Sequence, residues 1–219
     1  MRILSDEIKN HIGKAVHVEG WLHKKRMLGG LTFINIRDRR GLIQVVIDNK
    51  DEGEKLRGLQ IGTVLAVDGS AVEEARAPGG AELHEAKITV LVPVDAGPPI
   101  EIDKPLSHKS DNLDTLFEYR AIGLRNLQEQ KVFKIRAALL SNIRNFLIDN
   151  EFVEINTPKI IAAATEGGAE VFKVDYFGGE AFLAQSPQFY KQIMTGVYER
   201  VFEIAPAYRA ELSATTRHV

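Results

Sequence analysis

The first domain is decided by residues 31–48, which read LTFINIRDRRGLIQVVID. Two runs rich in Val, Ile and Phe flank the turn-forming triplet Arg39-Arg40-Gly41, a pattern typical of two paired strands. Similar segments occur on both sides, and the five predicted strands are 15–23, 31–37, 42–48, 63–71 and 83–92. The breaks are too short for crossover helices, except for a weakly helical stretch near 50–60. The pattern therefore predicts a small five-stranded barrel.

Five short strands with one weak helix before the fourth are the plan of an OB-fold, a partly open barrel that often binds oligonucleotides. An SH3-like barrel fits the same pattern. The pattern alone leaves both open.

A linker follows the predicted barrel. Residues 94–114 contain Gly97-Pro98-Pro99 and Pro105 among charged residues, without helical or strand periodicity. We expect a barrel domain over 1–100, a linker or hinge over 101–128 and a second domain over 129–219.

The second domain mixes helix and strand signals. Apolar residues recur at three and four positions over 129–150, which predicts an amphipathic helix with one buried face. Strand-like pieces are expected at 152–158, 170–176, 181–185 and 200–208, and a helix with proline in its first turn at 187–198. The expected fold class is α+β.

Composition limits the kind of protein. Of the 219 residues 44% are hydrophobic, and 28 Lys and Arg face 30 Asp and Glu, so any nucleic-acid contact must be local. The absence of Cys excludes disulfides and thiolate zinc sites. Charges near the N-terminus and the lack of an apolar run of about 20 residues favour a cytoplasmic protein without a membrane segment.

Polar side chains gather in three segments of the second domain. The loop 164–170 combines glycines with Glu166 and suits a flap over an amino group, although a surface turn is the alternative. In 185–191, a strand leads into a helix start, where Gln188 and Lys191 lie three residues apart on one face. Ser186 as a helix cap with solvated neighbours fits equally well.

In the third segment, 202–218, a predicted strand ends at Arg209 and Glu211. The loop that follows brings back two further basic residues, Arg217 and His218. A guanidinium can grip phosphate oxygens bidentately, and Arg217 or His218 can reach a terminal phosphate, which suits ATP. An exposed cluster of ion pairs is the alternative when the segment is taken alone.

Together, Thr165–Gly168, Gln185–Gln192 and Tyr208–His218 resemble the active-site segments of class II aspartyl-tRNA synthetases of the archaeal type. The resemblance implies roles for individual residues. Glu166 lies near the amino group of aspartate, Ser186 and Gln188 contact its backbone, and Lys191 pairs with its side chain. Arg209 is the catalytic arginine on the ATP α-phosphate, Glu211 lies by the adenine, and His218, beside Arg217, approaches the γ-phosphate.

The implied reaction converts aspartate and ATP to aspartyl-adenylate and transfers aspartate to tRNA(Asp). The long helix with 152–158 resembles motif 1, which forms the homodimer interface of the family. The Mg²⁺ ligands and motif 3 of the family are expected beyond residue 219, with no metal ligand within the chain. We therefore expect an incomplete catalytic sheet and a 219-residue chain that alone is unstable in its second domain and inactive.

The barrel resembles the anticodon-binding domain of the same family. Phe33 stands where the family stacks an anticodon base, Gln44 where it hydrogen-bonds one, and Arg26 where it contacts the anticodon loop. Lys24, Lys25 and Arg26 form the expected basic patch. Core packing is the alternative for Phe33.

His23 and Pro78 stand at the two positions that separate strict from relaxed tRNA choice among archaeal-type relatives, and here they match the relaxed type. The hypothesis adds tRNA(Asn) to the partners. Two rival readings are a noncatalytic RNA-binding paralogue and an asparaginyl or lysyl relative. Lys191 argues against the second rival because its charge suits a carboxylate better than an amide.

Overall fold

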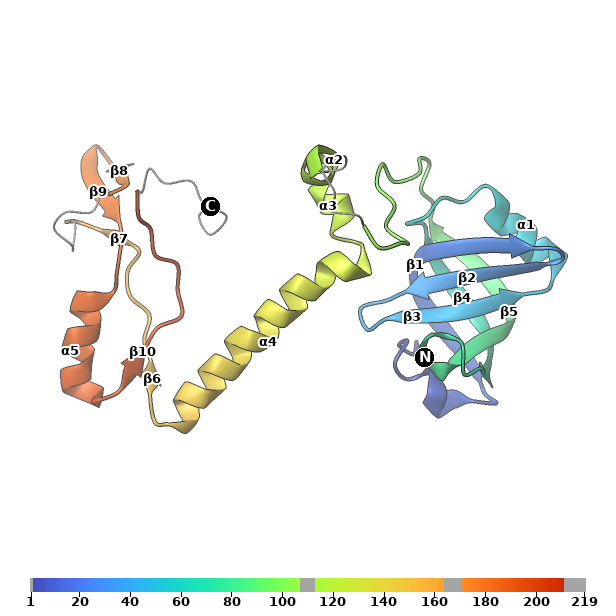
Figure 1. Cartoon of the computed structure of the whole chain (residues 1–219), viewed down its shortest axis with the longest axis horizontal. Helices are drawn as coiled ribbons and strands as arrows, with labels where there is room; N and C mark the ends of the chain where they lie inside the picture. Colours follow the sequence, from blue (N-terminus) through green and yellow to red (C-terminus); the bar gives the residue numbers. More distant parts are fainter. Residues whose placement is uncertain (1, 107–112, 164–170, 211–219) are drawn as a thin grey trace. The chain divides into compact units, whose positions relative to one another are not determined.

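The computed structural model describes residues 2–106, 113–163 and 171–210, and it divides into two units, Met1–Phe133 and Lys134–Val219 (Figure 1). The first unit contains the barrel and the hinge that follows it. The second contains most of a long helix and the small sheets after it. Each unit has its own architecture.

The first unit is built on a closed five-stranded barrel, as the sequence predicts. Its strands are β1 (Ala15–Leu28), β2 (Leu31–Arg37), β3 (Leu42–Ile47), β4 (Val64–Glu73) and β5 (Ala81–Val92), in the order β1-β2-β3-β5-β4. All neighbours pair antiparallel except β3 and β5, which are parallel. Because β1 pairs with both β2 and β4, the barrel closes without a free edge at that strand.

Strand β1 continues five residues past its predicted end at His23. The register against β2 shifts between Leu22 and Lys24, which marks a bulge. Beyond the bulge the basic residues keep pairing, with Lys24 opposite Asn35 and Arg26 opposite Phe33. The predicted end of β1 is wrong because charged residues on the outer face of a half-buried strand resemble a loop in sequence.

Alternation along the strands separates a core face from an outer face. The core cluster includes Val18, Leu22, Ile34, Ile36, Ile43, Val45, Leu65 and Leu83, all nearly inaccessible to solvent. Between these positions, Phe33, Asn35 and Gln44 project outward and are half-buried. The outer face of β1, β2 and β3 is therefore the polar and aromatic surface on which the first candidate site lies.

Three short helical elements close the barrel. They are η1 (Ile8–His11), α1 (Lys50–Arg57) and η2 (Pro78–Gly80). The Asn49 side chain accepts hydrogen bonds from the amides of Asp51 and Glu52 and so caps α1. The Asp38 carboxylate binds the Ser5 amide at 2.6 Å and hydroxyl at 2.7 Å, which ties the N-terminal segment to the turn between β2 and β3.

The hinge is more ordered than the linker expected over 101–128. It contains α2 (Leu113–Glu118) and α3 (Arg120–Gly123), and α4 (Leu127–Asp149) begins at its end. Ile100, Ile102 and Leu116 are buried and anchor the hinge within the first unit. Helix α4 itself confirms the predicted helix and starts two residues earlier than expected.

The second unit has two small sheets and one further helix. A three-stranded antiparallel sheet has the order β7 (Ile160–Ile161), β9 (Gly179–Leu183), β8 (Lys173–Tyr176), while β6 (Val153–Glu154) pairs in parallel with β10 (Val201–Phe202). Helix α5 spans Gln188–Tyr198. The predicted strands at 152–158 and 200–208 shrink to two paired residues each.

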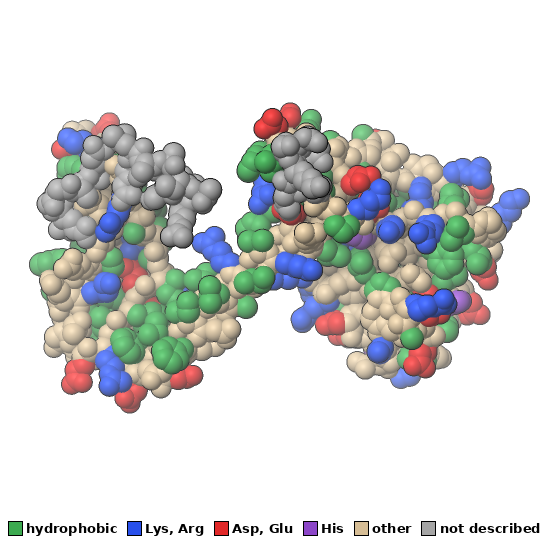
Figure 2. Space-filling model, viewed as in Figure 1, with side chains coloured by type: hydrophobic (Ala, Val, Ile, Leu, Met, Phe, Trp, Pro, Cys, Tyr) green, Lys and Arg blue, Asp and Glu red, His purple; other side chains and the backbone are tan. Residues whose placement is uncertain are grey.

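The predicted buried face of α4 is exposed among the described residues. Ile135 is 67% exposed, Leu139 57% and Phe146 65%, and Figure 2 shows hydrophobic side chains on the surface over this helix. The amphipathic pattern is present, but no described segment packs over its apolar stripe. The amphipathic pattern of α4 therefore does not lead to burial within the described part of the chain.

Candidate nucleic-acid interface and catalytic segments

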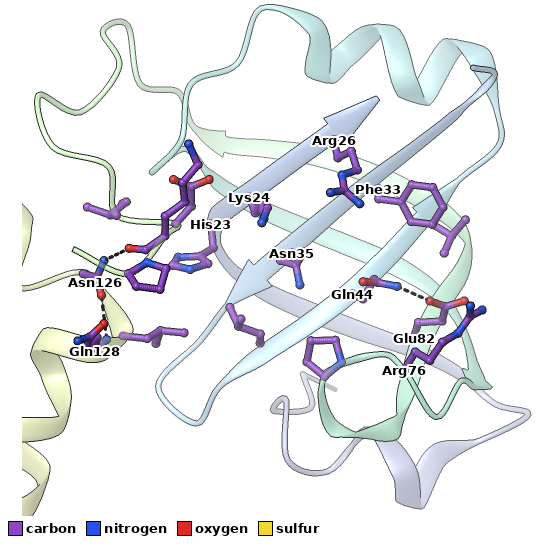
Figure 3. A pocket seen from close by; sticks show the side chains of 18 of the residues that line it. His23, Lys24, Arg26, Phe33, Asn35, Gln44, Arg76, Glu82, Asn126 and Gln128 are labelled. Carbon is purple, nitrogen blue, oxygen red and sulfur yellow. Dashed lines mark hydrogen bonds between the residues drawn. The ribbon is translucent and has the colours of Figure 1, made fainter. Parts of the chain in front are cut away.

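A groove of about 940 Å³ runs along the outer face of the barrel within the first unit (Figure 3). One wall consists of side chains from β1, β2 and β3, and the other of the hinge turn 102–105 and the first turn of α4. The groove is lined by all five predicted anticodon residues, which are His23, Arg26, Phe33, Gln44 and Pro78. They lie 55 positions apart in the chain at the extremes, and the barrel topology brings them together.

Strand register orders the barrel wall into two rows. Arg26 pairs with Phe33, which pairs with Val46. Lys24 pairs with Asn35, which pairs with Gln44. Each row therefore places a cation beside a ring or amide, which is the arrangement that stacks a base and neutralises its backbone.

Gln44 is held by a residue that sequence reasoning missed. Its Nε2 donates to Glu82 Oε2 at 2.7 Å, and the other oxygen of Glu82 lies 2.8 Å from His84 Nε2. Glu82 is buried, with 7% exposure. The hydrogen bond orients the Gln44 amide across the parallel pairing of β3 and β5, which sequence alone does not reveal.

His23 lies at the hinge end of the groove. Its side chain is 5% exposed, and its Nδ1 is buried without a hydrogen-bond partner. Burial lowers the His23 pKa, as do the charges of Arg37 and Lys24, while Asp103 opposes the shift. The imidazole is therefore mainly neutral at pH 7.

The basic patch predicted at residues 24–26 is divided by the structure. Lys24 and Arg26 line the groove, but Lys25 does not. Its Nζ instead donates to the carbonyl oxygens of Leu56 at 2.8 Å, Leu59 at 3.0 Å and Arg57 at 3.1 Å, at the end of α1. The three residues therefore do not share one surface, because a strand sends alternate side chains to opposite sides.

The second candidate site lies in the second unit, where two predicted active-site segments run side by side. The Tyr208 amide donates to the Ala184 carbonyl at 3.0 Å, and the Ala184 amide donates to the Lys159 carbonyl at 2.9 Å. The residues that follow, Ser186 and Arg209, thus lie at the ends of adjacent segments. Tertiary pairing brings together positions that are separate in sequence.

For the start of α5, the sequence leaves two interpretations open, a binding site for a small carboxylate and a helix cap with solvated neighbours. The Ser186 hydroxyl accepts a hydrogen bond from the Gln188 amide at 3.1 Å, although the N-cap residue of α5 is Pro187. Gln188 is exposed and Lys191 half-buried. The side chains of Gln188 and Lys191 take no part in this hydrogen bond.

A partly buried ion pair lies next to this second site. Lys159 Nζ lies 2.8 Å from Glu203 Oε1, and Glu203 also accepts from the Thr157 amide at 2.8 Å. Burial raises the Glu203 pKa, but hydrogen bonds from Lys159 and Thr157 outweigh this and lower it overall. This link holds the segment before Arg209 against the exit of β6, and sequence reasoning missed it.

Four predicted site residues, Glu166, Glu211, Arg217 and His218, lie outside the described residues. Within the described part of the chain, no group of three or more His, Asp or Glu side chains is arranged to bind a metal ion. No helix among the described residues has the length and apolar character that crossing a membrane requires.

Comparison with known families agrees with this geometry. Residues 16–91 match the OB-fold nucleic acid binding domain, and residues 112–219 match the class II tRNA synthetases (D, K and N). The chain belongs to the class II tRNA synthetases. In this synthetase chain the groove occupies the nucleic-acid-binding barrel, and the Ser186 and Arg209 segments occupy the synthetase domain.

Relatives of this chain come from several organisms. "Aspartate--tRNA(Asp/Asn) ligase" of Thermus thermophilus is 44% identical over 100% of this synthetase chain, and that of Sulfurisphaera tokodaii 46% identical over 99%. The asparaginyl-tRNA synthetase from Pyrococcus horikoshii complexed with asparaginyl-adenylate has a TM-score of 0.83 at 31% identity and covers 95% of this chain.

The synthetase chain spans about half the length of these relatives, 50% of both ligases and 48% of the solved structure. The OB-fold barrel followed by part of a class II catalytic domain is confirmed as the fold. The relatives support aspartate-tRNA ligase activity in the family.

Proposed function

We propose that this chain is part of an aspartate-tRNA ligase that activates L-aspartate with ATP and transfers it to tRNA(Asp). The observation that carries the proposal is the meeting of all five predicted anticodon residues on one groove of the barrel. The names of the relatives at 40–46% identity supply the amino acid and the reaction.

In the barrel, Phe33 stacks on an anticodon base, and Gln44 offers its amide to a base edge. Glu82 holds that amide in place through the 2.7 Å hydrogen bond. Lys24 and Arg26 neutralise phosphates beside these residues. The division of labour follows the two rows of strand register described above.

In the catalytic unit, the proposed roles divide between the two adjacent segments. Ser186 and Gln188 contact the aspartate backbone, and Lys191 pairs with its side-chain carboxylate. Arg209 grips the α-phosphate while the aspartate carboxylate attacks in line, so that aspartyl-adenylate forms and pyrophosphate leaves. Glu166, Glu211, Arg217 and His218 complete the aspartate and ATP contacts in this proposal.

The proposal includes Mg²⁺ bound to ATP, with ligands outside this chain, a homodimer and a cytoplasmic location. The exposed apolar face of α4 supports the homodimer, since such a face is covered in an assembled protein. Light scattering of the longer protein at two concentrations tests the dimer. A monomeric mass at both contradicts it.

Binding of an RNA hairpin with the aspartate anticodon tests the barrel half. Phe33→Ala and Gln44→Ala each weaken binding by about 1–3 kcal/mol, the value of a stacked base or a paired base edge. Phe177→Ala is the matched control, because Phe177 is 95% exposed and lies in the second unit. Equal affinity of all three variants and the parent chain contradicts the role of the groove.

Pyrophosphate exchange by the longer protein tests the catalytic half. The expected result is exchange that depends on aspartate and is lost in Lys191→Ala and Arg209→Ala. An asparaginyl-tRNA synthetase is the second candidate, favoured by the solved structure at 31% identity. Exchange with asparagine instead of aspartate establishes that candidate, and no exchange with either establishes a noncatalytic paralogue.

The proposal extends to tRNA(Asn) through His23 and Pro78. His23 is neutral and buried, and Pro78 is small and uncharged, so neither of these two positions presents a bulky aromatic ring or a basic side chain to reject a different third base. Pro78→Lys is expected to lower aspartylation of tRNA(Asn) more than that of tRNA(Asp). Failure of the longer protein to aspartylate tRNA(Asn) contradicts the extension.

A further inference from the structure

The groove has a second wall, here called the hinge wall, which contains none of the five predicted anticodon residues. It is lined by Lys104 of the hinge turn and by Asn126, Gln128 and Lys131 around the start of α4. Figure 3 shows Asn126 and Gln128 beside the outer face of the barrel. All belong to the first unit, as the barrel does. An RNA strand in the groove therefore has protein on both sides.

Cations on this lining differ in how far they are neutralised. Arg76 is held by both oxygens of Glu74, and Lys104 lies 2.8 Å from Glu101. Among the described residues, Lys24, Arg26 and Lys131 line the groove without a carboxylate partner. Lys24 and Arg26 stand on the barrel wall, so Lys131 is the corresponding free cation of the hinge wall.

Asn126 fastens the hinge wall together. Its side chain is 2% exposed, Nδ2 donates to the Lys104 carbonyl at 2.6 Å, and Oδ1 accepts from the Gln128 amide at 2.8 Å. One side chain thus caps α4 and holds the hinge turn against it. His23 lines the groove at the same end, beside Asn126 (Figure 3).

We propose that the hinge wall is part of the RNA-binding site, with Lys131 neutralising a backbone phosphate of the bound strand and Asn126 as its positioning residue. The inference rests on the proposed function, because it takes the anticodon loop as the occupant of the groove. A phosphate between Lys131 on one wall and Lys24 or Arg26 on the other fixes the strand in the groove. Bases then reach Phe33 and Gln44 in register.

The salt dependence of RNA binding by the 219-residue chain tests the proposal, with a fluorescent hairpin of the aspartate anticodon as the probe. Lys131→Ala is expected to lower the slope of log affinity against log salt by about 0.7 to 1, or about fivefold in affinity at 0.1 M salt. The loss is the same for hairpins with altered anticodon bases, since a phosphate contact carries no sequence information. Lys134→Ala is the matched control, one turn further along α4 and outside the lining.

Asn126→Ser separates positioning from helix capping, because serine caps α4 but cannot donate to the Lys104 carbonyl. It is expected to weaken RNA binding while the helix content stays unchanged. In this variant, a further Lys131→Ala change is expected to reduce RNA affinity by less than it does in the parent chain. An unchanged slope in Lys131→Ala overturns the proposal while the parent chain still binds. A parent chain that binds no hairpin overturns the proposed function and the inference together.

Discussion

Lys24 and Lys25 are neighbours in the chain with different tasks. Lys24 faces the groove, while Lys25 donates three hydrogen bonds to carbonyl oxygens at the end of α1. A cation at a helix C-terminus is stabilising because it neutralises the free carbonyls. Charge in the sequence therefore does not by itself mark an RNA contact.

Substitution of the two lysines separates stability from RNA binding. Lys25→Ala is expected to lower the free energy of unfolding by about 1–2 kcal/mol, since it removes charge-assisted hydrogen bonds. Lys24→Ala is expected to leave stability within about 0.5 kcal/mol and to reduce the salt slope of RNA binding instead. Urea unfolding and fluorescence anisotropy measure the two effects. The opposite assignment of effects contradicts the structure.

Two histidines of the barrel respond oppositely to acid. The His23 pKa is lowered by burial, so protonation below the ordinary value of about 6.5 favours the unfolded chain and stability falls as the pH drops. The His17 pKa is raised by its hydrogen bonds to Asp68 and Glu19, so its contribution is complete below about 6.5 and is lost as the pH rises through the folded-state pKa.

Thermal midpoints between pH 8 and pH 5.5 test both signs. His23→Asn is expected to make the chain less sensitive to acid than the parent, and His17→Asn more sensitive. His17 is partly exposed and its partner Asp68 is 60% exposed, so its effect is the smaller. Identical pH profiles of both variants contradict the assignment.

At the scale of elements, the barrel depends on a close crossing of β1 and β2. A Cβ on Gly20 would collide with the carbonyl oxygen of Arg37 and the side chain of Ile36. On its other side, Gly20 of β1 pairs with Leu65 of β4. The absence of a side chain at this position allows β1 to pair with both β2 and β4.

Gly20→Ala is expected to cost about 1–3 kcal/mol, because backbone must shift to admit the methyl group. Gly30→Ala is the control, since nothing lies within 4 Å of a Cβ there. Denaturant midpoints of the two variants measure the difference. A Gly20→Ala chain as stable as Gly30→Ala contradicts the close crossing.

At the scale of the whole molecule, the chain holds two units with separate packing. The barrel core uses residues of the first unit alone. The second unit relies on short strands and the partly buried Glu203–Lys159 ion pair, and many of its apolar side chains are exposed. We expect units with separate cores to unfold in separate transitions.

Calorimetry of the chain is expected to show two transitions, with the barrel melting at the higher temperature. Gly20→Ala lowers only the upper transition. Glu203→Ala lowers only the lower one, because it leaves Lys159 and the Thr157 amide without their partner. One transition that both variants shift equally contradicts independent units.

The sequence by itself determined the five strands, the helix α4, the α+β class and the family. Alternation and helical periodicity are local properties that a linear pattern records directly. It also marked Phe33 and Gln44, through the resemblance to the anticodon-binding domain of the family, and left core packing open for Phe33. Its errors occurred where local signals were ambiguous, at the end of β1 and in the hinge.

Only the tertiary structure decided which residues meet. The parallel pairing of β3 with β5 sets Glu82 against Gln44, and the hinge turn with Asn126 and Lys131 supplies the second wall of the groove. It also turned Lys25 away from that groove and set Glu203 against Lys159. These contacts join positions far apart in the chain, and their geometry follows from strand register and packing, which no local pattern encodes.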